Sequence, residues 1–121
     1  MATDTLEKAL VEVGRDPQTV GADLSIMRRH LRRKVQVNWT DELDGVFYGT
    51  IQIGGIEWGV DLCYRQKYDV YRMRIYIPQD HSPQIARRFD VQANNPYTCV
   101  NDFLVMIAML RMMRTLDLDK D

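Results

Sequence analysis

Alternating apolar and polar residues in the middle of the chain predict a β-sheet. Between residues 35 and 77, apolar side chains recur at every second position, which is the period of a half-buried strand. The pair Gly54-Gly55 divides this pattern and is typical of a two-residue hairpin, because both central positions of a type I′ turn need a positive φ. Pro78 ends the alternation. We therefore expect a four-stranded antiparallel meander over residues 35–77, with one face buried and the other largely exposed to solvent.

Helical spacing predicts helices before this meander. Apolar residues three and four positions apart indicate a short helix over residues 5–13 and a longer, basic helix over residues 23–34. Between them, Gly14-Arg15-Asp16-Pro17 is interpreted as a break, since proline cannot continue a helix interior. Asp23 is the expected N-cap of the second helix.

Another helix is expected over residues 98–116. Asn94-Asn95-Pro96 marks a break before it, and Thr98 or Asn101 is the expected N-cap. Phe103 and Ile107 belong to its wide apolar face, which we expect to cover the sheet. Residues 85–92 fit either a fifth strand or a helical turn.

These elements predict a single α+β domain over residues 1–121. Its four-stranded antiparallel meander packs on the C-terminal helix, with one or two N-terminal helices beside it. A chain of 121 residues with 45% apolar side chains can bury a core without disulfides or metals. Neither a secretory signal nor an apolar run of about 18–20 residues is present, so we expect a soluble, cytoplasmic protein that does not enter a membrane.

Charge is balanced over the whole chain but not along it. Sixteen Lys and Arg residues face seventeen Asp and Glu residues, a net charge of −1, which excludes a polybasic nucleic-acid coat. The expected basic helix nevertheless carries a dense cluster of cations: Arg28, Arg29, Arg32, Arg33 and Lys34.

This cluster has two interpretations. It could bind nucleic-acid phosphates or an acidic partner. It could also be a solvated helix end, favoured by the exposed carbonyls and paired with Asp41, Glu42 and Asp44. Near-neutral net charge favours the second interpretation, as does the placement of Tyr and Trp in strands rather than within the basic run.

The residues favour a non-enzymatic role over catalysis. Cys63 and Cys99 lack the spacing of a zinc site with the two histidines, and no phosphate-binding glycine loop opens a helix, so we expect no metal and no cofactor. Cys99 is the candidate nucleophile, since a helix N-terminus lowers a thiol pKa. Its other interpretation is a small apolar residue in the first helical turn. His81 is interpreted as a surface residue, and Asp61 as an exposed carboxylate without a catalytic role.

Four methionines lie close together on the C-terminal helix. Met106, Met109, Met112 and Met113 extend round more than one of its faces, which is more apolar surface than one sheet face needs. They either fill the core or form an interface with a protein partner or a second copy, because methionine adapts to varied surfaces. Met109, Met112 and Met113 are the candidate binding residues.

The predicted order of elements resembles the core of the ubiquitin-conjugating-enzyme-like fold, which includes RWD-type interaction modules. The likeness covers residues 23–113. Tyr76-Ile77-Pro78-Gln79-Asp80-His81-Ser82-Pro83 resembles the family's strand end with spaced prolines, and Asn95-Pro96-Tyr97-Thr98 resembles the entry to its next helix. The family's His-Pro-Asn tripeptide is absent, and its catalytic cysteine lies in a long flap for which this chain has no room. The resemblance therefore implies an inactive binding relative.

We thus expect a small protein-interaction or assembly module, including a homodimer among its forms. Cysteine-dependent thioester or acyl transfer through Cys99 is one alternative. Nucleic-acid binding through the Arg28 to Lys34 cluster is the other.

Overall fold

The computed structural model of the protein describes residues 14–76 and 88–119, with side chains as far as Met113. The helix expected over residues 5–13 and the loop with Asp80 and His81 lie outside these residues. The described elements, in chain order, are α2 (Pro17–Val35), β1 (Asn38–Leu43), β2 (Val46–Ile53), β3 (Ile56–Arg65), the short 3-10 helix η1 (Gln66–Tyr68), β4 (Val70–Tyr76), β5 (Arg88–Ala93) and α3 (Pro96–Asp119).

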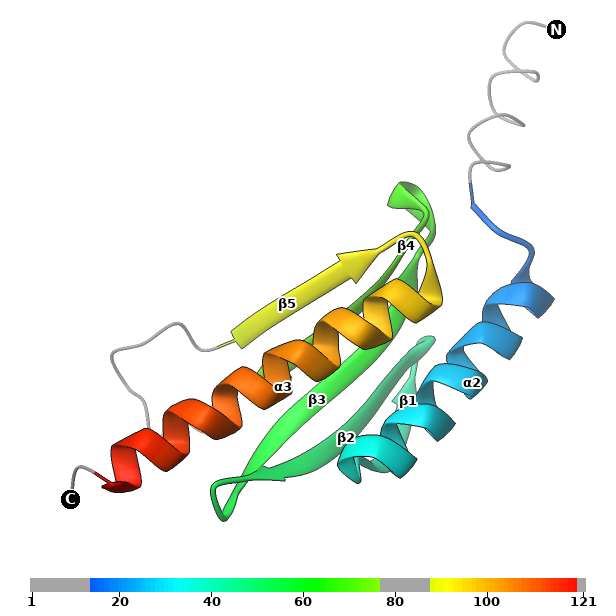
Figure 1. The fold of residues 1–121 in the computed structure, drawn as a ribbon. Helices are drawn as coiled ribbons and strands as arrows, with labels where there is room; N and C mark the ends of the chain where they lie inside the picture. Colours follow the sequence, from blue (N-terminus) through cyan, green and yellow to red (C-terminus); the bar gives the residue numbers. More distant parts are fainter. Residues whose placement is uncertain (1–13, 77–87, 120–121) are drawn as a thin grey trace, which may run out of the picture.

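Five strands form one antiparallel sheet whose spatial order follows the sequence, from β1 to β5. Helices α2 and α3 lie side by side over the same face of the sheet (Figure 1). The α+β class is therefore confirmed. The expected number of four strands is too low, because the ambiguous segment supplies a fifth strand that pairs with β4, with Val91 opposite Met73.

Two-residue turns set the register of the first two hairpins. Gly54 and Gly55 have φ values of +62° and +76°, which confirms the predicted hairpin. Asp44 and Gly45 connect β1 to β2 in the same way, with φ values of +52° and +78°.

Both helices begin at a proline, which corrects their expected starts. The Asp16 carboxylate accepts hydrogen bonds from the Gln18 and Thr19 amides, and Pro17 opens α2, six residues before the expected Asp23. Asn95 caps α3 in the same way, and Pro96 precedes the expected Thr98. A proline is compatible with the first helical position because its missing N–H has no intrahelical partner there.

The boundary between α2 and the sheet also differs from the prediction. Val35 is the last residue of the helix, not the first of a strand, and Gln36 ends α2 in the left-handed conformation with φ +57°. Val37 follows in a short connection, and its side chain is buried. The alternation of Val35, Val37 and Trp39 therefore crosses a change of element.

The core lies between the sheet and both helices. Phe103 and Ile107 of α3 are fully buried, as predicted, but Met27 and Leu31 of α2 are buried to the same degree. The sheet is thus covered by two helices rather than by the C-terminal helix alone, since a single helix is too narrow to cover five strands.

Candidate functional site

An apolar groove of about 500 Å³ runs between α3 and the edge strand β5. Apart from Asp102, its lining consists of large apolar side chains: Phe89, Val91, Val105, Met106, Met109, Leu110 and Met113. We call the side chains of Phe89, Val91, Val105, Met106, Met109, Met112 and Met113 the α3–β5 surface. The predicted candidates Met109, Met112 and Met113 all belong to it.

Three of the four methionines on this surface are exposed, whereas Met106 is half-buried against the core. Met109, Met112 and Met113 are 57%, 65% and 56% exposed, and Val105 is 59% exposed. The opposite side of α3 already fills the core, so the helix has apolar residues on two sides. A helix that is apolar all round is normally buried, and a contiguous exposed apolar patch commonly marks an interaction site.

A second hollow, of about 310 Å³, lies on the outward side of α2. We call it the arginine hollow; it is lined by Ser25, Arg28, Arg29, Arg32 and Trp39. The four helical residues follow the spacing i, i+3, i+4 and i+7, which places them on one face of α2. The other two predicted cations, Arg33 and Lys34, lie outside the lining, although they share the last turn of α2 with Arg32.

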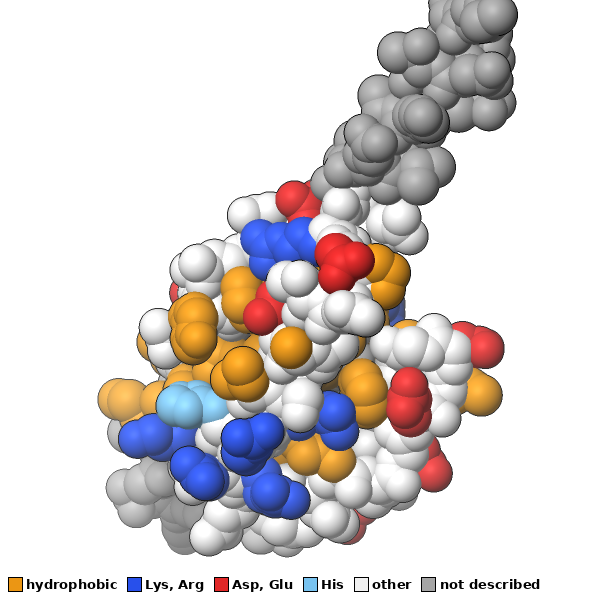
Figure 2. All heavy atoms as spheres, turned by 90° about the vertical axis from the view of Figure 1, so that its right-hand side faces the viewer, with side chains coloured by type: hydrophobic (Ala, Val, Ile, Leu, Met, Phe, Trp, Pro, Cys, Tyr) orange, Lys and Arg blue, Asp and Glu red, His pale blue; other side chains and the backbone are white. Residues whose placement is uncertain are grey.

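The predicted pairing of these cations with the acids at residues 41–44 is wrong. The chain reverses after α2, and β1 carries the acidic turn back to the other half of the helix, where Glu42 shares a cavity with Val20 and Leu24. Arg29, Arg32 and the two later cations form no ion pair with any side chain that the structure describes. Figure 2 shows most Lys and Arg side chains gathered in the lower part of this face, away from the acidic side chains.

The fold also brings an aromatic side chain to the basic face. The Trp39 indole N–H donates a hydrogen bond to the Arg28 carbonyl oxygen at 3.1 Å. The ring packs over Gly49, where a Cβ would come within 3.1 Å of it. The Arg28 guanidinium stacks on Phe47, 3.8 Å from the ring centroid. The sequence pattern missed this arrangement because Trp39 lies beyond the helix and reaches it only when β1 folds back.

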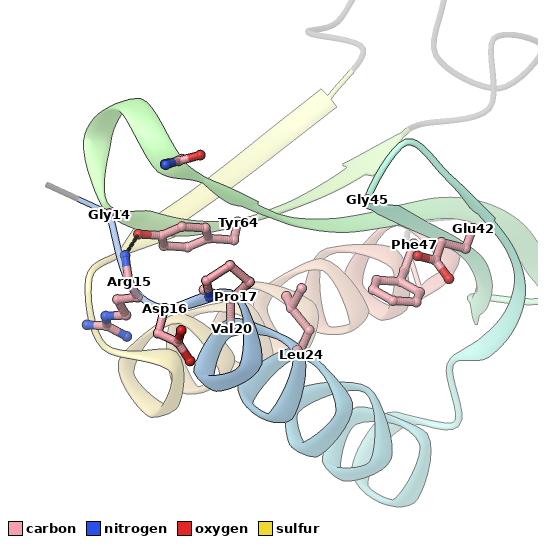
Figure 3. A pocket seen from close by; sticks show the side chains of 12 residues that line it. Gly14, Arg15, Asp16, Pro17, Val20, Leu24, Glu42, Gly45, Phe47 and Tyr64 are labelled. Atoms are coloured by element: carbon pink, nitrogen blue, oxygen red, sulfur yellow. Dashed lines mark hydrogen bonds between the residues drawn. The ribbon is translucent and has the colours of Figure 1, made fainter. Parts of the chain in front are cut away.

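A third hollow, of about 600 Å³, lies beside the start of α2. Figure 3 shows Val20 and Leu24 pointing from α2 towards the strands, between Tyr64 at one end and Phe47 at the other. The backbone N–H of Arg15 donates to the Tyr64 hydroxyl at 2.7 Å. None of the predicted site residues lies here.

A polar network fixes the Arg15 end of this hollow. The guanidinium lies 3.7 Å from Asp23 and 3.5 Å from Asp69, and it also donates to Asn94 of the β5–α3 connection at 3.0 Å. Asp23 also accepts the Tyr71 hydroxyl. Burial, then this bond to Asp23, raises the pKa of Tyr71 to about 12. These polar groups bind one another, and their hydrogen bonds and ion pairs join the start of α2 to the β3–β4 turn and to the start of α3.

Cys99 does not have the environment of a nucleophile. It is fully buried in the first turn of α3, and its thiol lies 3.6 Å from the Tyr71 carbonyl oxygen. Burial, followed by the negative charge of Asp102, raises the thiol pKa to about 12. At neutral pH the reactive thiolate is therefore negligible, and a substrate has no path to it.

The prediction that Asp61 is exposed is wrong. It is completely buried on the sheet face opposite the helices, where Arg74 binds both of its oxygens at 3.0 and 3.1 Å and Tyr76 donates its hydroxyl. Burial, then the bond to Asp61, raises the pKa of Tyr76 to about 12. Asp61 joins β3 to β4 through these bonds.

Other chemistries find little support in the described part of the chain. No group of three metal-binding side chains occurs there. No helix among residues 14–76 and 88–119 combines the length and apolarity of a membrane span. Comparisons with known proteins gave no match to a protein-family model, a curated protein or a solved structure.

Proposed function

We propose that the protein is a small non-enzymatic interaction module that assembles with a second copy of itself through the α3–β5 surface. The observation that carries this proposal is the exposed apolar stripe of α3 beside the groove that continues onto β5. Covering this stripe removes apolar area from water, at about 25 cal/mol per Å².

The spacing of the stripe supports a second copy as the occupant. Val105, Met109 and Met112 lie at i, i+4 and i+7, which is the spacing at which two helices pack along their length. Two copies related by a two-fold axis would place this apolar stripe against itself, so no complementary charge is required. The flexible methionine side chains can adjust to each other in such a contact.

The position of β5 supports the same arrangement. It is the last strand of the sheet, and no described strand pairs with its outer side. Exposed edge strands are open to pairing with another chain. An edge strand beside an apolar helix face therefore offers backbone hydrogen bonds and apolar contact on one surface.

We prefer this proposal to thioester or acyl transfer through Cys99, because that thiol is buried and its pKa is raised. The two unpaired thiols are typical of a reducing compartment, so we place the module in the cytoplasm as part of the same proposal. Its resemblance to RWD-type modules stays a prediction, since residues 77–83 of the resembling segment lie outside the described structure.

The test changes two exposed methionines to lysine, Met109→Lys and Met113→Lys together. Sedimentation velocity of the unaltered protein at micromolar concentration should give a dimer, twice the 14.2 kDa chain mass. The double variant should sediment as a monomer, because the two copies would bring four lysines into the apolar contact, where burying like charges is unfavourable.

Leu43→Lys is the matched control. Leu43 is 64% exposed on the β1–β2 hairpin, away from α3, so this lysine should leave the dimer intact. A monomeric unaltered protein across this concentration range would disprove self-association. Equal disruption by the control would show that the α3–β5 surface is not the contact.

A further inference from the structure

The arginine hollow combines three guanidinium groups with an aromatic wall. We propose that it binds the phosphate groups of a single-stranded nucleic acid, with a base stacked beside Trp39. The hollow lies on α2, whereas the proposed assembly surface lies on α3 and β5, so either proposal can fail without the other.

The charge on this face is not used within the described protein. The Arg28 Nε is buried without a hydrogen bond, and Arg29 and Arg32 are exposed without an ion pair among the described residues. Stacking on Phe47 holds the Arg28 guanidinium against the body of the protein. Guanidinium groups bind phosphate oxygens through paired donors, and Ser25 adds a hydroxyl to the same lining.

Trp39 directs the proposal towards nucleic acid. Carboxylates of an acidic peptide would satisfy the arginines but would leave the indole without a matching partner. In single-stranded nucleic acids the bases are free to stack on aromatic side chains close to cations that bind the backbone. The volume of about 310 Å³ is at the lower end of small-molecule pockets, enough for part of a nucleotide rather than a duplex groove.

The same residues disfavour a membrane surface as the ligand. A membrane-binding helix needs large apolar side chains beside its cations. The exposed large apolar residue of α2 is Ile26, which lies on its other side in a cavity shared with Pro96 and Tyr97 of α3. The basic face therefore lacks the apolar contact that insertion between lipids requires.

The helix dipole distinguishes Arg28 and Arg29 from the cations of the last turn. The exposed carbonyls at the end of α2 favour cations there and disfavour a bound anion, and this effect decays within one turn. Arg32, Arg33 and Lys34 lie in that turn, whereas Arg28 and Arg29 precede it by about one turn. Arg33 and Lys34 also lie outside the lining that the other cations share with Trp39. The hollow should therefore account for most of the affinity, although all these cations lie on one helix.

This difference defines a test with matched charge. Fluorescence anisotropy of labelled oligo(dT) of about 20 nucleotides, longer than the site of one small binding domain, measures affinity at low salt. The double variant Arg29→Ala/Arg32→Ala should weaken binding at least about tenfold. The double variant Arg33→Ala/Lys34→Ala removes the same charge and should weaken it less than about threefold.

Two further measurements test the phosphate contacts and the base contacts separately. The logarithm of the binding constant should fall against the logarithm of salt concentration with a slope of about −2, as expected for three phosphates on a single strand. Tryptophan fluorescence should be quenched by oligo(dT), and Trp39→Phe should abolish the quenching, because Trp58 is only 5% exposed.

Four results would overturn the proposal. They are no binding of oligo(dT) at low salt, equal losses in the two double variants, binding of a duplex or polyglutamate as tight as that of oligo(dT), and stronger binding to vesicles containing anionic lipid. Circular dichroism of each variant verifies that the fold is retained.

Discussion

The Cys99 thiol lies between α3 and the sheet, with none of its surface exposed. Its pKa is raised from 9.0 to about 12, mainly because burial penalises the charged thiolate. A helix N-terminus, which lowers thiol pKa values elsewhere, is outweighed here by the loss of water. Position in a helix alone therefore does not predict the reactivity of a cysteine.

We expect alkaline pH to destabilise the protein through this group. Above about pH 9 an unfolded chain loses the Cys99 proton while the folded chain keeps it, so the free energy of unfolding falls as pH rises towards 12. Tyr71 and Tyr76 add to this loss between about pH 10 and 12, because their folded pKa values are also about 12. Urea unfolding at several pH values measures the slope, at most about 1.4 kcal/mol per pH unit for Cys99.

Cys99→Ala should flatten the decline between about pH 9 and 10, where the tyrosines do not yet contribute. Thiol labelling provides the control: at pH 8 the folded protein should react only after urea is added. Rapid labelling of Cys99 in the folded state would contradict both the buried environment and the non-enzymatic role.

At the scale of single elements, two prolines explain the main errors in the expected helix bounds. Asp16-Pro17 and Asn95-Pro96 are an N-cap followed by the first helical position, although proline suggests a break when it is considered alone. Arg15 donates a hydrogen bond to Asn94, so the starts of the two helices lie close together. Figure 1 shows that the two helices run in the same direction.

The caps can be tested by substitution. Asp16→Ala removes the acceptor of two backbone amides and should lower the free energy of unfolding by about 1 kcal/mol. Asp16→Asn keeps a capping oxygen and should change it by only a few tenths of a kcal/mol. Urea denaturation of both variants provides the comparison, and equal losses would show that Asp16 acts through its charge rather than as a cap.

At the scale of the whole molecule, both helices hold the sheet from one side. Phe103 illustrates this packing, because it is fully buried where α3 meets the rest of the core. Tyr97 is on the same helix but 65% exposed. The two aromatic residues therefore belong to the same helix but differ in burial, so replacing each of them isolates the effect of burial.

Phe103→Ala should lower the free energy of unfolding by about 3–5 kcal/mol, since it removes a buried ring and leaves a cavity. Tyr97→Ala should cost less than about 1 kcal/mol, because its ring is already largely in water. Thermal and urea unfolding provide the measurement. An unchanged stability of Phe103→Ala would mean that α3 does not belong to the core.

Residue patterns determined the local structure of this protein: the alternation from Ile56 to Tyr64, the turn at Gly54-Gly55, and the apolar faces of two helices. Such patterns are visible in sequence because each depends on neighbours within one or two turns or pleats. The pairing of β5 depended on β4, a partner more than ten residues away, so local periodicity left it open.

Only the tertiary structure decided which charged and apolar groups stay exposed. The return of β1 carries the acidic turn away from the cations of α2 and brings Trp39 to them. The core takes Phe103 and Ile107 from α3 and leaves Met109, Met112 and Met113 outside. The same composition and spacing would fit a fold in which these groups were paired or buried. The direction that the chain takes after each turn decides which of them stay exposed.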